Sequence, residues 1–228
     1  MRFVTAMLFV LFSSTALADK VAAPAPGGRI KGKVTVTEAD GKPAAGVDVI
    51  VYILANNFNE TGGQTTEKIA QQGRKFVPDL VAITKDDYVE FPNNDPFLHN
   101  VFSQSPPRKF DLGSFKKGES KKKQFDQTGV VDVYCNIHPE MAATILVLPN
   151  KKHVRADAQG RYVLDGVPAG EVTVFAYTRR ATKPVSSKVT VTAGGEVSVD
   201  LALQRGAETA HMNKYGEKYH GESGSYPK

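Results

Sequence analysis

Three side chains that bind soft metal ions follow one another in the chain at intervals of three residues. Cys135 is the only cysteine among 228 residues, and His138 and Met141 follow it. The chain has five histidines and four methionines. A single cysteine would therefore have a histidine three residues later and a methionine six residues later by chance in roughly one case of 2600, so accident is a poor explanation. A further imidazole, His99, ends an extended segment that is interrupted by turn-forming Pro and Asn residues.

This set of side chains predicts a copper site. Two imidazoles, one thiolate and one weakly bound thioether are the ligands of the blue-copper centres that transfer electrons. We therefore expect four residues to bind one type 1 copper ion: His99, Cys135, His138 and Met141. The alternative is a buried, inert cysteine at the end of a strand, with the following histidine and methionine lining a turn.

Residues 1–18 have the features of a secretory signal peptide. Arg2 gives a positive start, an apolar stretch follows, and a small-residue cleavage site precedes Asp19. We therefore expect a periplasmic or otherwise exported protein, without stable membrane insertion because the apolar stretch is too short to span a bilayer. A lone cysteine in an oxidising compartment cannot form an internal disulfide, and protection by a metal fits the ligand spacing best.

The charge of the chain argues against nucleic acid as a partner. Removal of residues 1–18 takes away one arginine, which leaves 28 basic and 24 acidic residues and a net charge of +4. Between Arg108 and Lys123, however, seven basic residues accompany only two acidic ones. Two interpretations stay open: the cluster can attract a redox protein with an acidic face, or it can protect an edge strand from aggregation.

An all-β fold is predicted from about Gly28 to Leu203. Val, Ile, Tyr and Phe recur in short alternating runs between turn residues, and no segment keeps a helical period with caps at both ends. The middle block divides into seven expected strands, a number typical of a small sandwich: 67–72, 80–84, 87–91, 100–104, 121–125, 130–135 and 143–148. Alternation along the expected strand 130–135 places Val131, Val133 and Cys135 on one face, so the thiol is expected to point inward.

Residues 67–150 resemble a cupredoxin domain of the plastocyanin and amicyanin kind. Four segments carry the resemblance: Phe76-Val77-Pro78, residues 88–95, His99-Asn100-Val101 and residues 133–141. The resemblance implies a Greek-key sandwich in which His99, Cys135 and His138 are equatorial ligands. It also implies that Met141 is the axial ligand and that Asn100 is a second-shell residue that tethers the ligand loop. Glu140 departs from the pattern, since many relatives have an apolar surface there.

The flanking segments resemble the two halves of another sandwich. Residues 29–52 are similar to the opening of a transthyretin-like, carboxypeptidase regulatory-like domain, and residues 156–203 are similar to its closing part. The whole arrangement resembles exported proteins of the methylamine-utilisation or plastocyanin-like kind. We therefore expect six segments: a signal peptide (1–18), a flexible leader (19–28), the first part of an outer sandwich (29–66), a cupredoxin domain (67–150), the second part of the outer sandwich (151–204) and a mobile tail (205–228).

The remaining histidines carry weaker expectations. His211, Met212 and His220 lie in the polar, Gly-rich tail, where no spacing fixes a metal geometry, and His153 is interpreted as a surface residue. A copper enzyme is disfavoured because a second kind of copper centre would need further histidine clusters. The expected function is one-electron transfer, and the alternatives are a copper delivery or storage protein and a non-redox β-sandwich interaction module.

Overall fold

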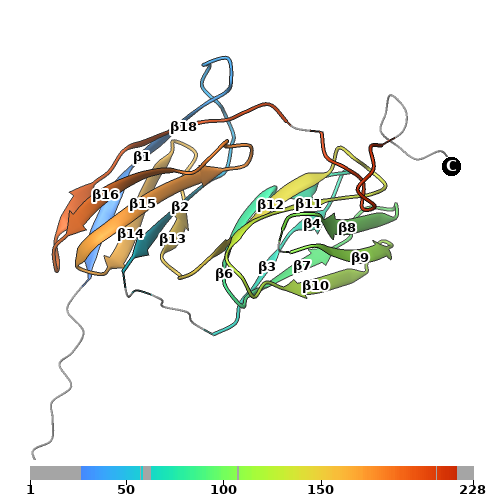
Figure 1. The fold of residues 1–228 in the computed structure, drawn as a ribbon, viewed down its shortest axis with the longest axis horizontal. Coiled ribbons are helices and arrows are strands. Elements are labelled where there is room, and N and C mark those ends of the chain that lie inside the picture. The colour runs from blue at the N-terminus through green and yellow to red at the C-terminus, as the bar shows by residue number, and fades with distance from the viewer. Residues whose placement is uncertain (1–26, 57, 59–62, 107, 209, 220–228) are drawn as a thin grey trace, which may run out of the picture.

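The computed structural model describes residues 27–56, 58, 63–106, 108–208 and 210–219. It confirms the all-β class, since these residues form eighteen strands and no helix. Two β-sandwiches lie side by side along the longest axis of the molecule (Figure 1). No helix long and apolar enough to cross a membrane is found in this part of the chain. The expected signal peptide and most of the expected leader lie outside the described residues.

The outer sandwich is built from the two ends of the chain. Its first sheet has β1 (Gly28–Thr37) between β14 (Arg161–Val167) and β17 (Glu196–Ser198), and β18 (Leu201–Gln204) also pairs with β1. Its second sheet has the order β13 (His153–Arg155), β2 (Val49–Ala55), β15 (Gly170–Thr178) and β16 (Val185–Val191). Strands that precede residue 56 thus pair with strands that follow residue 152.

The inner sandwich consists of β3 to β12, the strands that lie between β2 and β13 in the chain. One sheet has the order β6 (Leu80–Thr84), β12 (Ala142–Leu148), β11 (Gly129–Tyr134), β8 (His99–Ser103) and β9 (Phe110–Phe115). The other has the order β10 (Ser120–Gln124), β7 (Tyr88–Pro92) and β3 (Thr66–Lys68), and β4 (Ala70–Gln71) pairs with β5 (Phe76–Val77). β5 and β9 were not expected. In β9 an Asp, a Gly at φ 69° and a Ser interrupt the alternation of apolar residues that marks a strand.

Alternation along β11 determines which side chains reach the core of the inner sandwich. Val131 and Val133 are buried, and Cys135 follows them on the same face with no exposed surface, as expected. The same core contains the rings of Phe91, Phe115 and Phe125 together with the side chain of Met141, among others. The thiol therefore lies at the end of a strand, within a packed apolar interior that limits the movement of its neighbours.

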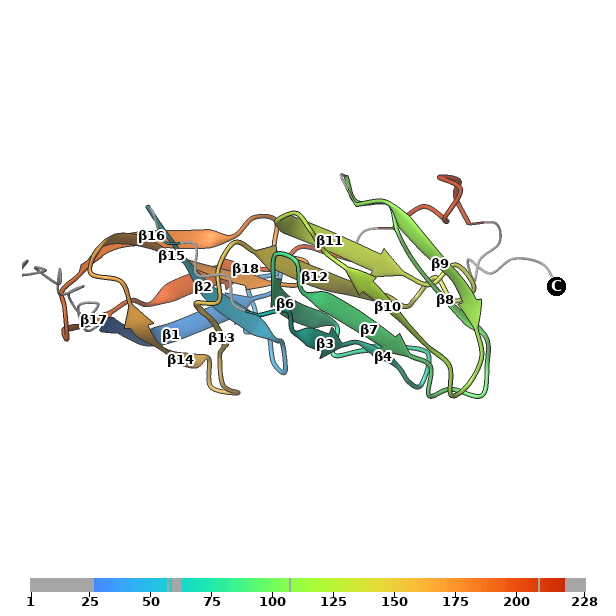
Figure 2. The same cartoon turned by 90° about the horizontal axis from the view of Figure 1, so that it is seen from below.

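The two sandwiches meet through an apolar layer of their own. Leu80, Leu146 and Leu148 of the inner sandwich pack with Ile50, Tyr52 and Tyr177 of the outer one. The rings of Tyr52 and Phe175 stack beside this layer, with their centroids 5.1 Å apart and their planes 9° apart. Figure 2 shows β6 and β12 next to β13 and β2 at this junction. Such burial favours one fixed arrangement of the sandwiches over free domain movement.

His153 differs from the expectation of a surface residue. It lies in β13 and lines a cavity between the sandwiches, together with Ile50, Val81 and Arg155. Burial lowers the pKa of its imidazole, which therefore favours the neutral form. The sequence offered no signal for this position, because the two lysines that precede it are typical of a surface turn.

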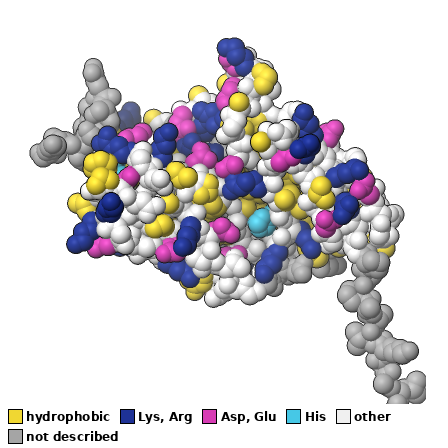
Figure 3. Space-filling view, turned by 180° about the vertical axis from the view of Figure 1, so that it is seen from behind, with side chains coloured by type: hydrophobic (Ala, Val, Ile, Leu, Met, Phe, Trp, Pro, Cys, Tyr) yellow, Lys and Arg dark blue, Asp and Glu magenta, His cyan; other side chains and the backbone are white. Residues whose placement is uncertain are grey.

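The lysines of β10 lie on an edge strand and cover neighbouring rings. Lys121 donates a hydrogen bond from Nζ to the carbonyl oxygen of Leu112 in β9 (2.6 Å) and lies over the ring of Phe115. Lys123 lies over the ring of Phe110 in the same way. These contacts favour edge protection for Lys121 and Lys123. On the face shown in Figure 3, basic and acidic side chains are interspersed over both sandwiches.

Candidate metal site

The three predicted ligands His99, Cys135 and His138 meet at one end of the inner sandwich. His99 is the first residue of β8, Cys135 directly follows β11, and His138 lies in the loop between β11 and β12. The backbone N–H of Met141 donates to the carbonyl oxygen of His138 (3.0 Å), and the N–H of Cys135 donates to that of Met141 (3.3 Å). The short loop is therefore closed on itself, which fixes where its side chains point.

The spacing of the donor atoms fits one shared ion. Sγ of Cys135 lies 3.8 Å from Nδ1 of His99 and 3.8 Å from Nδ1 of His138, and the two nitrogens are 3.0 Å apart. An ion at about 2.1 Å from each nitrogen and about 2.3 Å from the sulfur would separate sulfur from nitrogen by about 3.8 Å at angles near 120°. The 3.0 Å between the two nitrogens corresponds to an angle of about 90° at the same ion. Among the described residues, these three form the one group of His, Cys, Asp or Glu side chains close enough to share a metal ion.

Met141 is placed near the same site by its backbone and by its burial. Its side chain is 1% exposed and belongs to the apolar core that contains Cys135. The hydrogen bond between its carbonyl oxygen and the N–H of Cys135 brings the two residues together across the loop. Its role as a fourth ligand remains a prediction.

Asp95 orients the ring of His99. Its Oδ2 lies 2.9 Å from Nε2 of His99, so Nδ1 is left to face the thiol. The carboxylate itself accepts hydrogen bonds from the backbone N–H groups of Gly73 (2.7 Å) and Arg74 (2.9 Å). Burial alone would raise the pKa of Asp95, but these hydrogen bonds and the one to His99 outweigh it and lower the pKa. A carboxylate on the far nitrogen of a ligand histidine is a common support of metal sites.

Asn100 contacts the ligand loop from the adjacent strand. Its backbone N–H lies 3.5 Å from Sγ of Cys135, and its side-chain oxygen accepts a hydrogen bond from the N–H of Asn136 (3.3 Å). Its Nδ2 donates to Oδ1 of Asp111 in β9 (2.6 Å). The side chain thus connects two strands to the residue after the thiol.

Burial shifts the pKa values of Cys135 and His138 in opposite directions. Burial raises the pKa of the Cys135 thiol, although backbone hydrogen bonds, chiefly from Asn100, offset part of this effect. Burial and the nearby His99 and Arg74 lower the pKa of His138, which keeps its imidazole neutral. Because only a thiolate and neutral imidazoles bind metals, binding of an ion should release the thiol proton.

One side of the site lies close to solvent. His138 is buried at 8% exposure, but the ring of Phe97 lies beside it, with the centroids 6.4 Å apart. Phe97 is 48% exposed and Leu98 is 54% exposed. These two side chains form an apolar rim next to the ligand nearest the surface.

Sequence reasoning found three residues that the structure brings together and missed one that supports them. Asp95 was noted only as part of a matching segment, although it precedes His99 by four residues. A signal existed: the run Asn93-Asn94-Asp95-Pro96 predicts a turn, and a turn returns its carboxylate toward the following strand. In the described part of the chain His211 does not join this group of ligands but stacks on Tyr134, with the centroids 3.8 Å apart, and Met212 is 46% exposed.

Replacement of Asn100 by alanine should lower the free energy of unfolding by about 1–2 kcal/mol, because a buried side chain that makes two hydrogen bonds is removed. Urea unfolding of the metal-free protein measures this. Asn94→Ala is the matched control, since the side chain of Asn94 is exposed. Equal stabilities of the two variants would contradict the tethering role.

Part of the chain is similar in structure to copper proteins, at low identity. A copper-containing nitrite reductase from Thermus scotoductus is 26% identical over 36% of this chain and 22% of its own, with a TM-score of 0.34. A purple cupredoxin from Nitrosopumilus maritimus is 22% identical over 36% of this chain and 98% of its own, with a TM-score of 0.33. Amicyanin from Paracoccus versutus is 20% identical over 36% of this chain and 80% of its own, also with a TM-score of 0.33.

No protein-family model matches the chain, and no curated protein matches it significantly. The structural likenesses concern about a third of the chain and carry no argument about its activity. The feature of this chain that bears on function is a buried thiol and two buried imidazoles whose donor atoms lie within 4.8 Å of one another.

Proposed function

We propose that this protein is an exported one-electron carrier, not an enzyme, whose inner sandwich is a cupredoxin with a single type 1 copper. The observation that supports this most is the convergence of one thiol and two imidazoles from β8 and the loop after β11, all buried in a rigid apolar core. His99, Cys135 and His138 would hold the ion, with Met141 as the weak axial ligand. Copper, when bound, supplies a centre that gains and loses one electron.

The residues of the site favour electron transfer over copper delivery. His99 and Cys135 are each 0% exposed, and Met141 is 1% exposed. A protein that hands over its metal benefits from open, exchangeable ligands, whereas burial of this kind restricts the access of a competing ligand. Asp95 holds His99, and Asn100 holds the ligand loop, so little movement would accompany a change of charge. His138, next to the exposed rim of Phe97 and Leu98, is the exit that we propose for the electron.

Visible absorption and electron paramagnetic resonance spectra after addition of one equivalent of Cu(II) test the proposal. A type 1 site should give an intense thiolate-to-copper band that reductant bleaches reversibly and oxidant restores. A weakly absorbing Cu(II) protein would refute the type 1 assignment. A colourless protein that binds Cu(I) tightly but does not cycle would instead support copper delivery or storage.

The basic loop after β9 lies beside the proposed site, and this position supports the proposal of an anionic partner. His99 pairs with Phe115 across the sheet, so Lys116 and Lys117 follow directly at that end. The loop is held there because the N–H of Gly118 donates to the carbonyl oxygen of Asn93 (2.8 Å). Both lysines are exposed, in contrast to Lys121 and Lys123. We therefore assign attraction of a redox protein with an acidic face to this loop.

The double variant Lys116→Gln/Lys117→Gln should slow oxidation of the reduced protein by ferricyanide, a trianion, by about two- to fivefold at low ionic strength. The difference should disappear near 1 M salt, where charges are screened beyond about 3 Å. Stopped-flow absorbance measures both rates. Lys33→Gln/Lys42→Gln, which removes the same charge from the outer sandwich, is the control. Equal slowing in both variants would show that net charge alone is responsible.

A further inference from the structure

The described part of the expected mobile tail, residues 205–208 and 210–219, contacts both sandwiches. We call residues 205–208 and 210–219 the C-terminal arm. Figure 1 shows the arm leaving the outer sandwich and crossing to the far end of the inner one. Asn213, in its middle, is 0% exposed. The arm is therefore packed against the protein, and its start and its end are held by different sandwiches.

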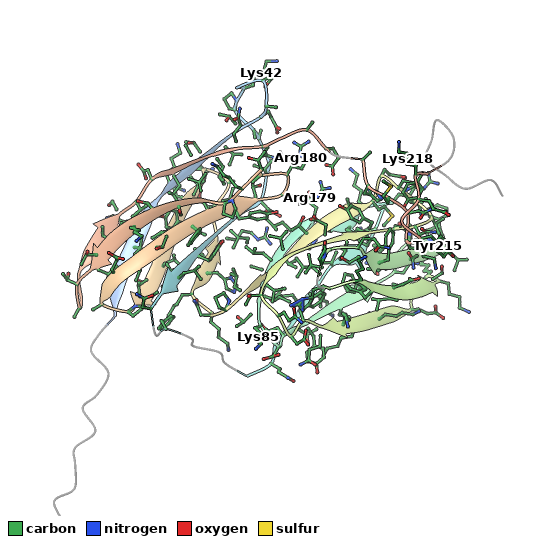
Figure 4. All side chains as sticks on the ribbon, viewed as in Figure 1. Lys42, Lys85, Arg179, Arg180, Tyr215 and Lys218 are labelled. Atoms are coloured by element: carbon green, nitrogen blue, oxygen red, sulfur yellow. The ribbon has the colours of Figure 1, made fainter. Side chains whose placement is uncertain are left out.

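The start of the arm is anchored on the outer sandwich. The N–H of Arg205 donates to the carbonyl oxygen of Thr37 (2.8 Å), and its guanidinium forms an ion pair with Glu38 (2.8 Å). The N–H of Gly206 donates to the carbonyl oxygen of Arg180 (2.9 Å). Both terminal nitrogens of the Arg179 guanidinium, Nη1 and Nη2, donate to the carboxylate of Glu208. Figure 4 shows Arg179 and Arg180 where the arm leaves this sandwich.

The second half of the arm is fixed on the inner sandwich. The ring of His211 stacks on that of Tyr134, with the planes 11° apart. Gln104 donates a hydrogen bond from Nε2 to the carbonyl oxygen of Lys214 (2.6 Å). Nζ of Lys214 pairs with Oδ2 of Asp111 (2.8 Å), the same carboxylate whose other oxygen holds Asn100. The arm thus joins the hydrogen-bond network that supports the ligand loop.

Two further contacts reach the ligand loop directly. The N–H of Lys214 donates to Oδ1 of Asn136 (3.0 Å), and the hydroxyl of Tyr219 donates to the carbonyl oxygen of Cys135 (3.4 Å). On its other side, Asn136 donates its N–H to Asn100. The Cys135-Asn136 segment is therefore held between β8 and the arm.

We propose that the arm is a built-in support of the copper site, in which Lys214 and Tyr219 are positioning residues for the Cys135-Asn136 segment. This inference rests on the proposed function. It also gives the outer sandwich a role, since that sandwich anchors the start of the arm. Loss of the arm contacts should loosen the thiolate ligand while it leaves all four ligand side chains in place.

The test compares two double variants of the full chain loaded with Cu(I). Tyr219→Phe/Lys214→Met removes the hydroxyl and the ammonium that hold the loop and its network. Tyr88→Phe/Lys218→Met makes the same two chemical changes at Tyr88 in β7 and at Lys218, an exposed side chain of the arm that is labelled in Figure 4. A chelator that binds Cu(I) strongly reports the dissociation rate of the ion, and electron paramagnetic resonance of the Cu(II) form reports the ligand geometry.

The first variant should release Cu(I) about three- to tenfold faster than the wild type and change the copper hyperfine splitting. The control should match the wild type in both measurements. If the two variants behave alike while the wild type shows a type 1 spectrum, the proposed support by the arm is overturned.

Hydrogen exchange of the metal-free protein separates this inference from the proposed function. Faster exchange of the Asn136 amide in the first variant than in the control would establish the support even if the wild type gave no thiolate-to-copper band. Equal exchange rates in the two variants would refute it independently of copper.

Discussion

Replacement of Cys135 by serine should abolish the thiolate-to-copper band entirely. An alcohol is a poor ligand for copper at neutral pH, because it stays protonated where a metal-bound thiol does not. His99 and His138 remain, so weak Cu(II) binding with an ordinary, faint spectrum is expected in place of the type 1 signal. Titration with Cu(II), followed by absorbance and electron paramagnetic resonance, measures the loss.

The same substitution should leave the metal-free protein folded. Serine is close in size to cysteine, and its hydroxyl can accept the hydrogen bond that the N–H of Asn100 now directs at Sγ. Burial of a more polar group in this apolar core should still cost about 1–3 kcal/mol. Circular dichroism and urea unfolding of the metal-free forms check this. If the variant kept an intense thiolate-type band, a ligand other than Cys135 would be responsible and the assignment would be wrong.

A stabilisation by copper should disappear together with the band. A ligand that binds only the folded state raises the free energy of unfolding in proportion to the logarithm of its concentration relative to its dissociation constant. The wild type should therefore unfold at a higher temperature with one equivalent of copper than without it, and the Cys135→Ser variant should show little difference. An equal shift in both proteins would point to copper bound elsewhere.

The sequence was most informative where one residue type fixes both chemistry and position. Cys135 is a single cysteine on a period-two strand, so alternation alone predicted that it points inward next to Val133. The loop to Met141 is so short that its three ligand-type residues stay close in any compact fold. For His99, which lies on a different strand, the resemblance to cupredoxins predicted a position at the same end of the sandwich as Cys135.

The supporting contacts could not be predicted in the same way. Asp95 reaches His99 only because the backbone N–H groups of Gly73 and Arg74, more than 20 positions earlier, hold its carboxylate. Lys214 and Asn136 are 78 positions apart and join through one hydrogen bond. Such contacts between distant polar residues leave no periodic trace, since they depend on single side chains and not on a repeated apolar face.

The amino-acid composition of the arm predicts a disordered segment, whereas the structure gives the arm contacts with both sandwiches. A polar, Gly-rich segment is typical of a chain that cannot bury enough apolar surface to pay for its ordering. Here the ordering is offset by hydrogen bonds, ion pairs and ring stacking on surfaces that already exist, such as the ring of Tyr134. The seven-strand expectation failed for a related reason in β9, where Gly113 and its polar neighbours are tolerated because Phe110 and Phe115 provide the packing.

Replacement of Asp95 by asparagine should have the second largest effect on the site. Three donors point at this carboxylate: the N–H groups of Gly73 and Arg74 and Nε2 of His99. An amide has one oxygen, so its NH₂ group must face at least one of these donors. We expect copper affinity to fall by about 10–100-fold, because His99 loses the partner that fixes its tautomer and its ring orientation. Competition with a Cu(I) chelator measures the affinity.

The role of the Asp95 carboxylate can also be measured without metal, from the pH dependence of the stability of the metal-free protein. The pKa of Asp95 is lowered in the folded protein, so its contribution to stability is present above the pKa of the unfolded chain and is lost as the pH falls through the folded pKa. The metal-free variant should therefore be less stable than the wild type by about 2–3 kcal/mol at pH 7, and the difference should shrink below about pH 4. Urea unfolding at several pH values measures it.

Asp86→Asn is the matched control for both measurements. Asp86 has φ 74°, a conformation that asparagine adopts readily, and no hydrogen bond to its carboxylate is found among the described residues. Its replacement should change neither copper affinity nor the pH dependence. If Asp95→Asn behaved like this control, the carboxylate would not be holding His99, and the ring would have to be oriented by the packing of the core alone.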